Sequence, residues 1–203
     1  MTTDTGTDAR AIKEALTEHD VLPAIRERFS ARAFSDEPLS EDELFTLFEA
    51  AAWAPSAMNE QPWRYRYAIR GTDAFDRVWN CLNTGNQPWA KNAAALVVCS
   101  VMTTLERNGQ PNGSRLHDLG LANAQLMMQA TSMGIFGHLM GGFDHARAQQ
   151  ELGTEPQKEE VFCLLALGRL ASPDSLEEPF RTRELTTRTR RPLGQFVTRL
   201  SSV

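Results

Sequence analysis

The chain has 203 residues, a net charge of −5 and a pI near 5.4. A chain of this length can bury a sizeable core in one domain, so we expect a single domain over residues 1–203. The acidic balance argues against a nucleic-acid-binding protein. No apolar run approaches the roughly 20 residues of a membrane-spanning helix, so no membrane partner is expected.

The N-terminal residues 1–10 are polar and lack the apolar core of a signal peptide, so they are predicted to form a flexible tail. The three cysteines, Cys81, Cys99 and Cys163, form no CxxC pair and no cluster with histidines. We therefore predict no metal site. Cys99 and Cys163 lie in apolar runs and are expected as buried free thiols. Unpatterned cysteines are typical of the reducing cytosol, which predicts a cytoplasmic protein.

Two helices are predicted in the first quarter of the chain. Residues 7–19 are suited to a first helix. Ser40–Glu43 has the sequence of a capping box, and apolar residues follow it at helical spacing. This second helix should end near Ala54, because Pro55 disfavours the helical conformation at the residue before it.

Three segments are predicted to be strands. Residues 65–69 alternate aromatic and basic side chains before a glycine turn. Residues 94–101 are a short, β-branched apolar run, which is typical of a central strand that is buried on both faces. Residues 162–170 are a second apolar run, where leucine and alanine leave a helix as the alternative.

A long helix is predicted over residues 119–133, where apolar side chains form a stripe. Its Met127 and Met128 are expected to pack in the core or between subunits. Asp144 is placed to begin a short helix that Gly153 ends. Because strands and helices do not alternate strictly, the predicted fold class is α+β and not a doubly wound sheet.

The sequence lacks the glycine-rich patterns of a Rossmann site and of a P-loop, and it lacks the nucleophile elbow of an α/β-hydrolase. His138 and His145 are seven residues apart and have no third partner at ligand spacing, so packing or solvent exposure is expected. His117-Asp118 could be an acid/base pair, or Asp118 could stabilise the first turn of a helix. Both readings stay open.

Three segments are unusual for a purely structural protein. Arg28, Ser30 and Arg32 place two guanidinium groups and a hydroxyl close together, and arginine is suited to phosphate contacts. Residues 52–63 form a small-residue loop bracketed by two prolines and two tryptophans. Residues 188–191 are a basic cluster in an acidic protein. Taken singly, each has a plain alternative: solvated arginines, a packed connector and a solvated tail.

In order, these segments resemble the flavin-dependent nitroreductase family. The resemblance rests on R-x-S-x-R-x-F, on Asp36-Glu37-Pro38 before an amphipathic helix, and on A-P-S-x-x-N-x-Q-P-W. It continues through residues 85–93, the helix over 118–133, residues 140–143 and the R-R-P-L ending. It covers the chain roughly from Leu22 to Val197.

The resemblance implies a central, mostly antiparallel sheet flanked by helices, in an intertwined homodimer with an FMN site at each interface. It implies FMN as the cofactor and NADH or NADPH as the co-substrate. The activity would be the reduction of small acceptors, such as nitroaromatics or quinones, by ping-pong hydride transfer. The flavin N5 would carry the chemistry, so no catalytic side chain is expected.

The family's flavin contacts fall on named positions of this chain. Arg28 and Ser30 match contacts to the phosphate and ribityl end of FMN. Arg188 and Arg190 match a C-terminal basic pair that reaches the same phosphate. Arg32 matches a basic residue near the pyrimidine edge, where it would stabilise negative charge on the reduced ring.

The remaining contacts involve backbone and polar groups. Met140, Gly141 and Gly142 match the segment whose backbone lies against N5, where glycine permits close approach. Asn86 matches a further contact to the pyrimidine edge. A loop that reaches the FMN held mainly by the other subunit is matched by three residues: Pro55, Ser56 and Asn59.

Two positions depart from the pattern of the family. Phe29 stands where many members carry a basic residue or histidine, and Gly141 stands where some carry an acidic residue. Members of this family also dehalogenate, oxidise heterocycles or break down flavin, so a specialised enzyme is the first alternative. A non-catalytic flavin-binding or storage protein and a plain structural dimer are the others.

Overall fold

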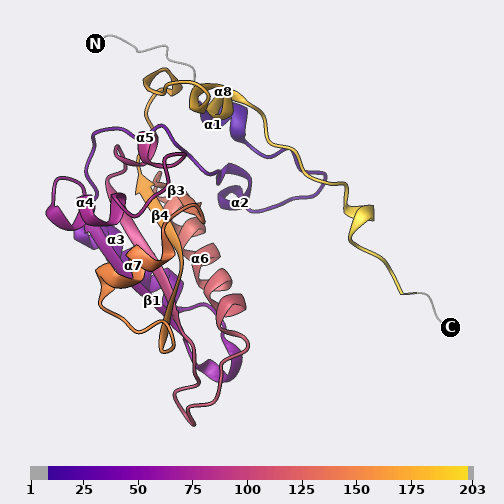
Figure 1. The fold of residues 1–203 in the computed structure, drawn as a ribbon. Helices are drawn as coiled ribbons and strands as arrows, with labels where there is room; N and C mark the ends of the chain where they lie inside the picture. Colours follow the sequence, from indigo (N-terminus) through magenta and orange to yellow (C-terminus); the bar gives the residue numbers. More distant parts are fainter. Residues whose placement is uncertain (1–8, 201–203) are drawn as a thin grey trace.

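The computed structural model describes residues 9–200 (Figure 1). In chain order its elements are α1 (Ala9–Lys13), α2 (Pro23–Glu27), α3 (Glu41–Ala52), η1 (Ala57–Asn59), β1 (Trp63–Ile69), α4 (Asp73–Trp79), α5 (Gln87–Ala90), β2 (Ala95–Met102), α6 (Arg115–Ser132), β3 (Phe136–Met140), α7 (His145–Leu152), β4 (Glu159–Gly168), η2 (Pro173–Ser175), α8 (Phe180–Leu185) and η3 (Leu193–Gln195). The predicted tail over residues 1–10 lies almost wholly outside the described residues.

One antiparallel sheet organises the chain, with strand order β1-β2-β4-β3. β2 is apolar except at Ser100, and it is buried at all but its last residue because helices cover both faces of the sheet. The register places Cys99 opposite Cys163, and both thiols are free and buried as predicted. The α+β class and the antiparallel sheet are therefore confirmed.

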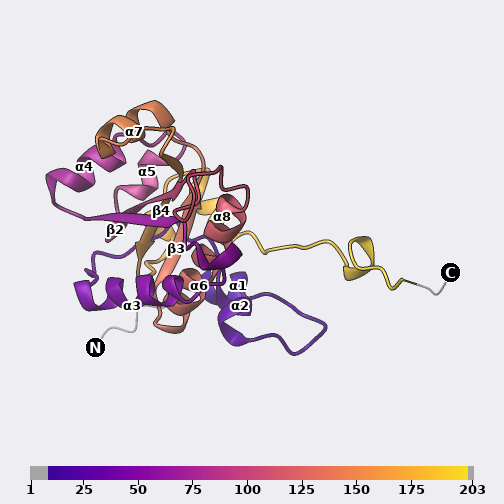
Figure 2. The same ribbon diagram turned by 90° about the horizontal axis from the view of Figure 1, so that it is seen from below.

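The sheet separates two apolar clusters. Figure 2 shows the helices that cover its two faces, with α3 and α6 on one side and α4 and α7 on the other. On one face, α3 and α6 bury Leu44, Leu47 and Leu126 against the sheet. On the other face, the short helices α4, α5 and α7 contribute to a second cluster that includes Phe75 and Trp89. The alternation of side chains along a strand sends neighbouring residues of β2 into opposite clusters.

The local signals for helix ends act as predicted. The Ser40 hydroxyl accepts a hydrogen bond from the backbone N–H of Glu43, whose carboxylate accepts one from the backbone N–H of Ser40. This capping box begins α3, which ends at Ala52, close to the predicted boundary. Asp144 accepts from the Arg147 N–H at the start of α7, and Gly153 ends that helix with a φ of 63°.

The first predicted helix, residues 7–19, is wrong in its second half. α1 ends at Lys13, and the chain then turns so that the Ala15 N–H donates to the Arg26 carbonyl. Leu16 is fully exposed, so a longer helix would have had no apolar face to bury there.

Four short elements were not predicted. β3, of five residues, lies at one edge of the sheet, and α4, α5 and α8 have seven, four and six residues. Such lengths leave little periodicity to read. The last predicted strand, residues 162–170, begins and ends earlier in the structure, at Glu159 and Gly168.

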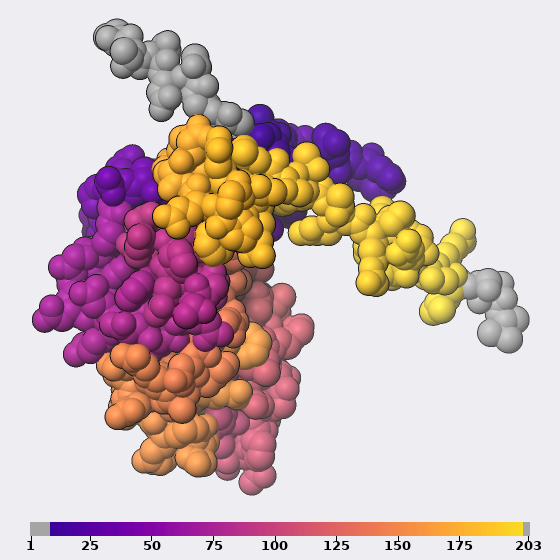
Figure 3. Space-filling model, turned by 45° about the horizontal axis from the view of Figure 1, so that its top comes forward, coloured from indigo at the N-terminus to yellow at the C-terminus, as the bar shows by residue number. Residues whose placement is uncertain are grey.

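The C-terminal segment leaves the body of the protein. α8 packs against α1, and the chain then extends outward as an arm (Figures 1 and 3). Residues 189–200, called the arm below, are all exposed, including Leu193, Phe196 and Val197. The arm therefore leaves these three apolar side chains open to solvent within the described chain.

Candidate functional site

An extended segment over residues 28–34 positions the first group of predicted site residues. Its apolar members Phe29, Ala31 and Ala33 are buried, whereas Arg28 and Arg32 are half-buried and Ser30 is exposed. Ser30 forms a parallel bridge with Gly137 of β3, so the segment lies beside the edge of the sheet. The alternation brings the three predicted residues to one outward face.

Phe29 explains one departure from the family pattern. Its ring is 1% exposed and packs on Phe136 of β3, with ring centroids 5.1 Å apart. The position faces the core and not the site. A basic residue at position 29 would therefore need a different path to reach a ligand.

Three guanidinium groups gather where this segment meets the C-terminal arm. Burial, and then the charge of Arg190, lower the pKa of Arg28. Burial, and then the charges of Arg28 and Arg190, lower the pKa of Arg188. Within residues 9–200, none of the three forms an ion pair with a carboxylate. This arginine cluster (Arg28, Arg188 and Arg190) is therefore a site where an anion would relieve repulsion.

Arg188 differs from the other two because its guanidinium is already engaged with backbone. It donates to the carbonyl of Arg28 at 2.5 Å, and also to the carbonyls of Lys13 and Arg26. Arg190, by contrast, is exposed and donates only to the adjacent Thr189 carbonyl. Arg188 thus fixes the shape of the cluster, while Arg28 and Arg190 keep donors for a ligand.

Arg32 lies apart from the arginine cluster, against α5 and α8. Its guanidinium carbon is 5.8 Å from the ring centroid of Trp89, within the range of a cation–π contact. Its Nη1 lies 3.9 Å from Oε2 of the fully buried Glu184. Burial lowers the pKa of Arg32, and the charge of Glu184 opposes that change.

His138 completes this neighbourhood from β3. Its ring is tilted against that of Trp89, with centroids 4.5 Å apart, and its Nδ1 lies 3.0 Å from the Ala31 carbonyl. Burial, and then the charge of Arg32, lower the pKa of His138 to about 4. The ring is therefore neutral near pH 7, with its proton on Nδ1. Together with His145, which packs on Phe143, it confirms the predicted packing role.

The loop after β3 meets the predicted pyrimidine-edge contact. The Asn86 side-chain amide donates to the Gly142 carbonyl at 3.0 Å. A Cβ on Gly142 would lie 3.0 Å from that same amide nitrogen, so a larger residue would push the two apart. A Cβ on Gly141 would meet nothing within 4 Å, which leaves its backbone open on the surface. The structure therefore brings Asn86 and the Met140–Gly142 segment together.

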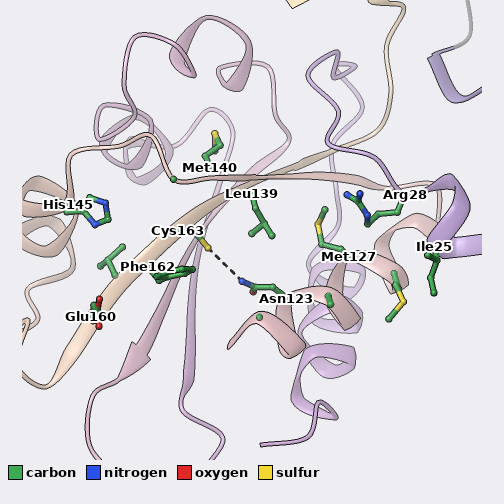
Figure 4. Close-up of a pocket in the computed structure, with 15 residues that line it drawn as sticks. Ile25, Arg28, Asn123, Met127, Leu139, Met140, His145, Glu160, Phe162 and Cys163 are labelled. Carbon is green, nitrogen blue, oxygen red and sulfur yellow. Dashed lines mark hydrogen bonds between the residues drawn. The ribbon is translucent and has the colours of Figure 1, made fainter. Parts of the chain in front are cut away.

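A cavity of about 910 Å³ lies between α2, α6, β3 and β4 (Figure 4). Arg28, Met140 and Gly141 line it, together with Met127 and Cys163. The Asn123 amide points to Cys163 Sγ across its floor, at 3.7 Å. The cavity is mainly apolar with a cation at one end, which suits a flat ring that carries an anionic tail.

The predicted loop, residues 55–61, is held at the other end of α6. The Ala57 N–H donates to the buried Asp118 carboxylate at 3.0 Å, and the Gln61 N–H donates to the Ser56 hydroxyl at 3.0 Å. Pro55 and Asn59 are exposed. His117 lies beside the other oxygen of Asp118, so Asp118 serves both the first turn of α6 and this loop.

The loop has an unusual backbone. Met58, Asn59 and Gln61 have φ values of 55°, 58° and 47°, a region that residues other than glycine rarely adopt. Strain of this kind persists only where neighbouring groups fix the chain, and it is common at binding sites. The hydrogen bonds of Ser56 and Asp118 provide that restraint.

The two groups of predicted residues are separate within one chain. The loop meets α6 at Asp118, whereas Arg28 shares the cavity with Met127 and Met128. Nine to ten residues of helix lie between these points, a rise of roughly 14 Å. The cavity itself extends along α6 as far as Gly120, two positions from Asp118, and residues 55, 56 and 59 are not among the residues that line it.

Two contacts of this region were not predicted from the sequence. The bond of Asp118 to Ala57 was not expected, and Glu184 was overlooked. The alternation of polar and apolar residues over 28–34 could have predicted the extended segment. No local signal marks Glu184, a single acid in the basic stretch over residues 181–191.

Other kinds of site find no support in the part of the chain that the structure describes. No group of three His, Cys, Asp or Glu side chains in residues 9–200 could hold a metal ion. Within the same range, each helix is too short or too polar to cross a bilayer.

Comparison with known proteins gives a consistent picture. A profile described as the nitroreductase family matches residues 25–83 and 70–169, which together exceed half of the chain. A protein of Archaeoglobus fulgidus, named as a candidate NADH dehydrogenase/NAD(P)H nitroreductase, is 28% identical over 152 residues, covering 73% of this chain and 84% of that protein.

Solved structures agree with the sequence match. An oxidoreductase containing FMN superimposes with a TM-score of 0.83 at 33% identity, covering 90% of this chain and 93% of that chain. A candidate nitroreductase of Desulfovibrio desulfuricans in complex with FMN superimposes with a TM-score of 0.70. It is 22% identical and covers 92% of this chain and all of that chain, so it supports the fold alone.

Proposed function

The chain belongs to the nitroreductase family, and on that premise we propose that it binds FMN and acts as an NAD(P)H-dependent oxidoreductase. Small acceptors such as nitroaromatics or quinones would be its substrates. Bound FMN supplies the redox chemistry, and the residues of the chain bind and orient it. A cytoplasmic location stays a prediction from the unpaired cysteines.

The arginine cluster is the observation that carries this proposal. Burial, and then the charges of neighbouring arginines, lower the pKa of Arg28 and of Arg188, and none of the three guanidinium groups has a carboxylate partner within residues 9–200. A phosphate that carries close to two negative charges would compensate them. We assign Arg28 and Arg190 to the phosphate and Ser30 to the adjoining hydroxylated chain. Arg188 would act by fixing the carbonyls around them.

The residues around β3 suit the flat ring. The Met140–Gly142 backbone lines the apolar cavity without side-chain obstruction at Gly141. Asn86 is oriented by its bond to Gly142, and Arg32 is held against Trp89. We assign both side chains to the pyrimidine edge, where a cation favours the reduced, more negative form of the ring.

We further propose that the working unit is a homodimer. The arm exposes Leu193, Phe196 and Val197, and the loop over 55–61 is bonded to α6 near the cavity without contributing Pro55, Ser56 or Asn59 to its lining. Two-fold symmetry would place one subunit's loop at the other's cavity and let each arm cover apolar surface of its partner.

An anaerobic absorbance experiment tests the proposed function. The purified protein is loaded with FMN and mixed with NADH or NADPH, and the yellow absorbance of the flavin is followed. We expect bleaching by at least one nucleotide and recovery on addition of a quinone or nitroarene. Bound FMN that neither nucleotide bleaches would favour a specialised or storage protein, and failure to bind FMN would refute the proposal.

A further inference from the structure

Glu184 is a fully buried acid at the root of the C-terminal arm. Its Oε1 accepts hydrogen bonds from the backbone N–H groups of Arg32, at 3.0 Å, and Ala33, at 3.4 Å. Its Oε2 accepts no hydrogen bond in the part of the chain that the structure describes, and it lies 3.9 Å from Arg32 Nη1. A carboxylate is thus placed beside a side chain that we assign to the flavin.

The charges around Glu184 are mostly positive. Lys13 Nζ donates to the carbonyls of Arg183 and Thr186, at 2.6 Å each, so its ammonium group is committed to the end of α8. Burial lowers the pKa of Lys13 and of Arg32, and in both cases the charge of Glu184 opposes the effect. The charge of Glu184 therefore favours the protonated forms of the buried Lys13 and the half-buried Arg32.

We propose that Glu184 is a positioning residue that holds the backbone of Arg32 and offsets part of the positive charge that Arg32 presents to a bound flavin. This inference rests on the proposed function, since it takes FMN as the ligand. Its consequence concerns the relative affinity of the site for oxidised and reduced FMN. Reduction adds negative charge at the pyrimidine edge, so that ratio depends on the net charge of the Arg32–Glu184 pair.

The hydrogen-bond pattern makes Glu184→Gln a clean probe. Because Oε2 accepts no hydrogen bond, an amide NH₂ in its place removes none, and the remaining oxygen can still accept from Arg32 and Ala33. The substitution thus removes charge and keeps shape. Glu177→Gln is the matched control, because it removes the same charge from an exposed side chain shortly before α8.

The experiment measures the dissociation constants of oxidised FMN and of chemically reduced FMN, under anaerobic conditions, for the full chain and its variants. In Glu184→Gln we expect binding to shift toward reduced FMN by about tenfold, which corresponds to a potential about 30 mV higher for a two-electron couple. Arg32→Met should shift the ratio in the opposite direction. Glu177→Gln should match the unsubstituted protein.

The outcomes distinguish a failure of the role proposed for Glu184 from a failure of the proposed function. An unchanged or reversed ratio in Glu184→Gln, beside a changed ratio in Arg32→Met, would overturn the role of Glu184 and leave the proposed function standing. Unchanged ratios in both would remove Arg32 from the pyrimidine edge and this inference with it. An unsubstituted protein that binds no FMN would overturn both.

A stability measurement covers the case in which Glu184→Gln folds poorly. Removing one partner of a buried ion pair leaves the other without compensation, whereas removing both is often tolerated. We expect Glu184→Gln to lower the Tm, and Glu184→Gln with Arg32→Met to recover part of the loss. Strictly additive effects of the two substitutions on Tm would contradict the pairing.

Discussion

The two ends of α6 present two kinds of predicted binding surface. Near its C-terminal half, the arginine cluster holds like charges together without a carboxylate partner among the described residues. Near its N-terminus, the loop over 55–61 holds a strained backbone in place with the hydrogen bonds of Asp118 and Ser56.

The two surfaces differ in whether their interactions are satisfied within the chain. The arginine cluster lacks a counter-charge, so its loss should reduce ligand affinity more than stability. The loop has its hydrogen bonds satisfied within the chain, so its loss should reduce stability first. A homodimer would join one surface of each kind at every site.

The largest effect is expected from removing the arm, which we propose covers the surface of the partner subunit in the homodimer. Deleting residues 192–203 keeps Arg188 and Arg190 but removes the exposed apolar side chains of the arm. We expect a monomer in light scattering and a loss of most FMN binding, because no partner loop reaches the cavity. Deleting residues 201–203 alone is the control, and this variant should remain a dimer and still bind FMN. A truncated chain that remains a dimer would contradict the assignment of the arm.

Substitutions in the arginine cluster test its affinity role. Arg28→Ala and Arg190→Ala should each weaken FMN binding by about 1–3 kcal/mol, the value of a charge-assisted contact, as measured by fluorescence titration. The Tm of the FMN-free protein should not fall, since like-charge repulsion is relieved. Arg191→Ala, at an exposed neighbouring position, should change neither quantity. Unchanged FMN affinity in both cluster variants would refute the phosphate site.

Asp118→Ala addresses the opposite end of α6. It removes the acceptor for the Ala57 N–H, and we expect a loss of about 2 kcal/mol in the free energy of unfolding. Asp118→Asn keeps an acceptor oxygen and should lose less, as denaturant unfolding would measure. Equal stability of Asp118→Ala and the unsubstituted protein would mean that the loop is held by other contacts.

The smallest effect concerns His138, which lies on the edge strand β3 and packs on Trp89. Its folded pKa of about 4 is below the unfolded value near 6.5, so below pH 6.5 the unfolded state binds more protons and stability falls as pH drops. We expect this histidine to cost about 1 kcal/mol between about pH 6.5 and pH 5.5. His138→Asn should reduce that slope in denaturant unfolding; an equal slope would exclude His138 as the cause.

The sequence predicted most of what depends on local chemistry. The capping box at Ser40, the end of α7 at Gly153 and the apolar run of β2 are all confirmed, because each depends on neighbouring residues. The family resemblance placed Asn86 and Gly142 in one site, and the structure brings them together.

What the sequence could not predict depends on contacts between distant segments. Arg188 was expected at a phosphate, but the carbonyls that engage it come from residues 13, 26 and 28. Glu184 meets Arg32 across 152 positions of the chain, and no spacing rule connects them. The short β3 and α8 gain their stability from this packing and not from their own sequence.

The reach of Arg188 has a consequence for how the protein is made. Segments near the two ends of the chain, some 160 to 175 positions apart, must meet before the shape around Arg28 is fixed. Ribosomes add about 5–20 residues per second, so the N-terminal segment is synthesised many seconds before Arg188, whose guanidinium donates to its carbonyls. If the arginine cluster holds the phosphate as proposed, a nascent chain stalled before residue 188 would lack that contact and should retain FMN poorly.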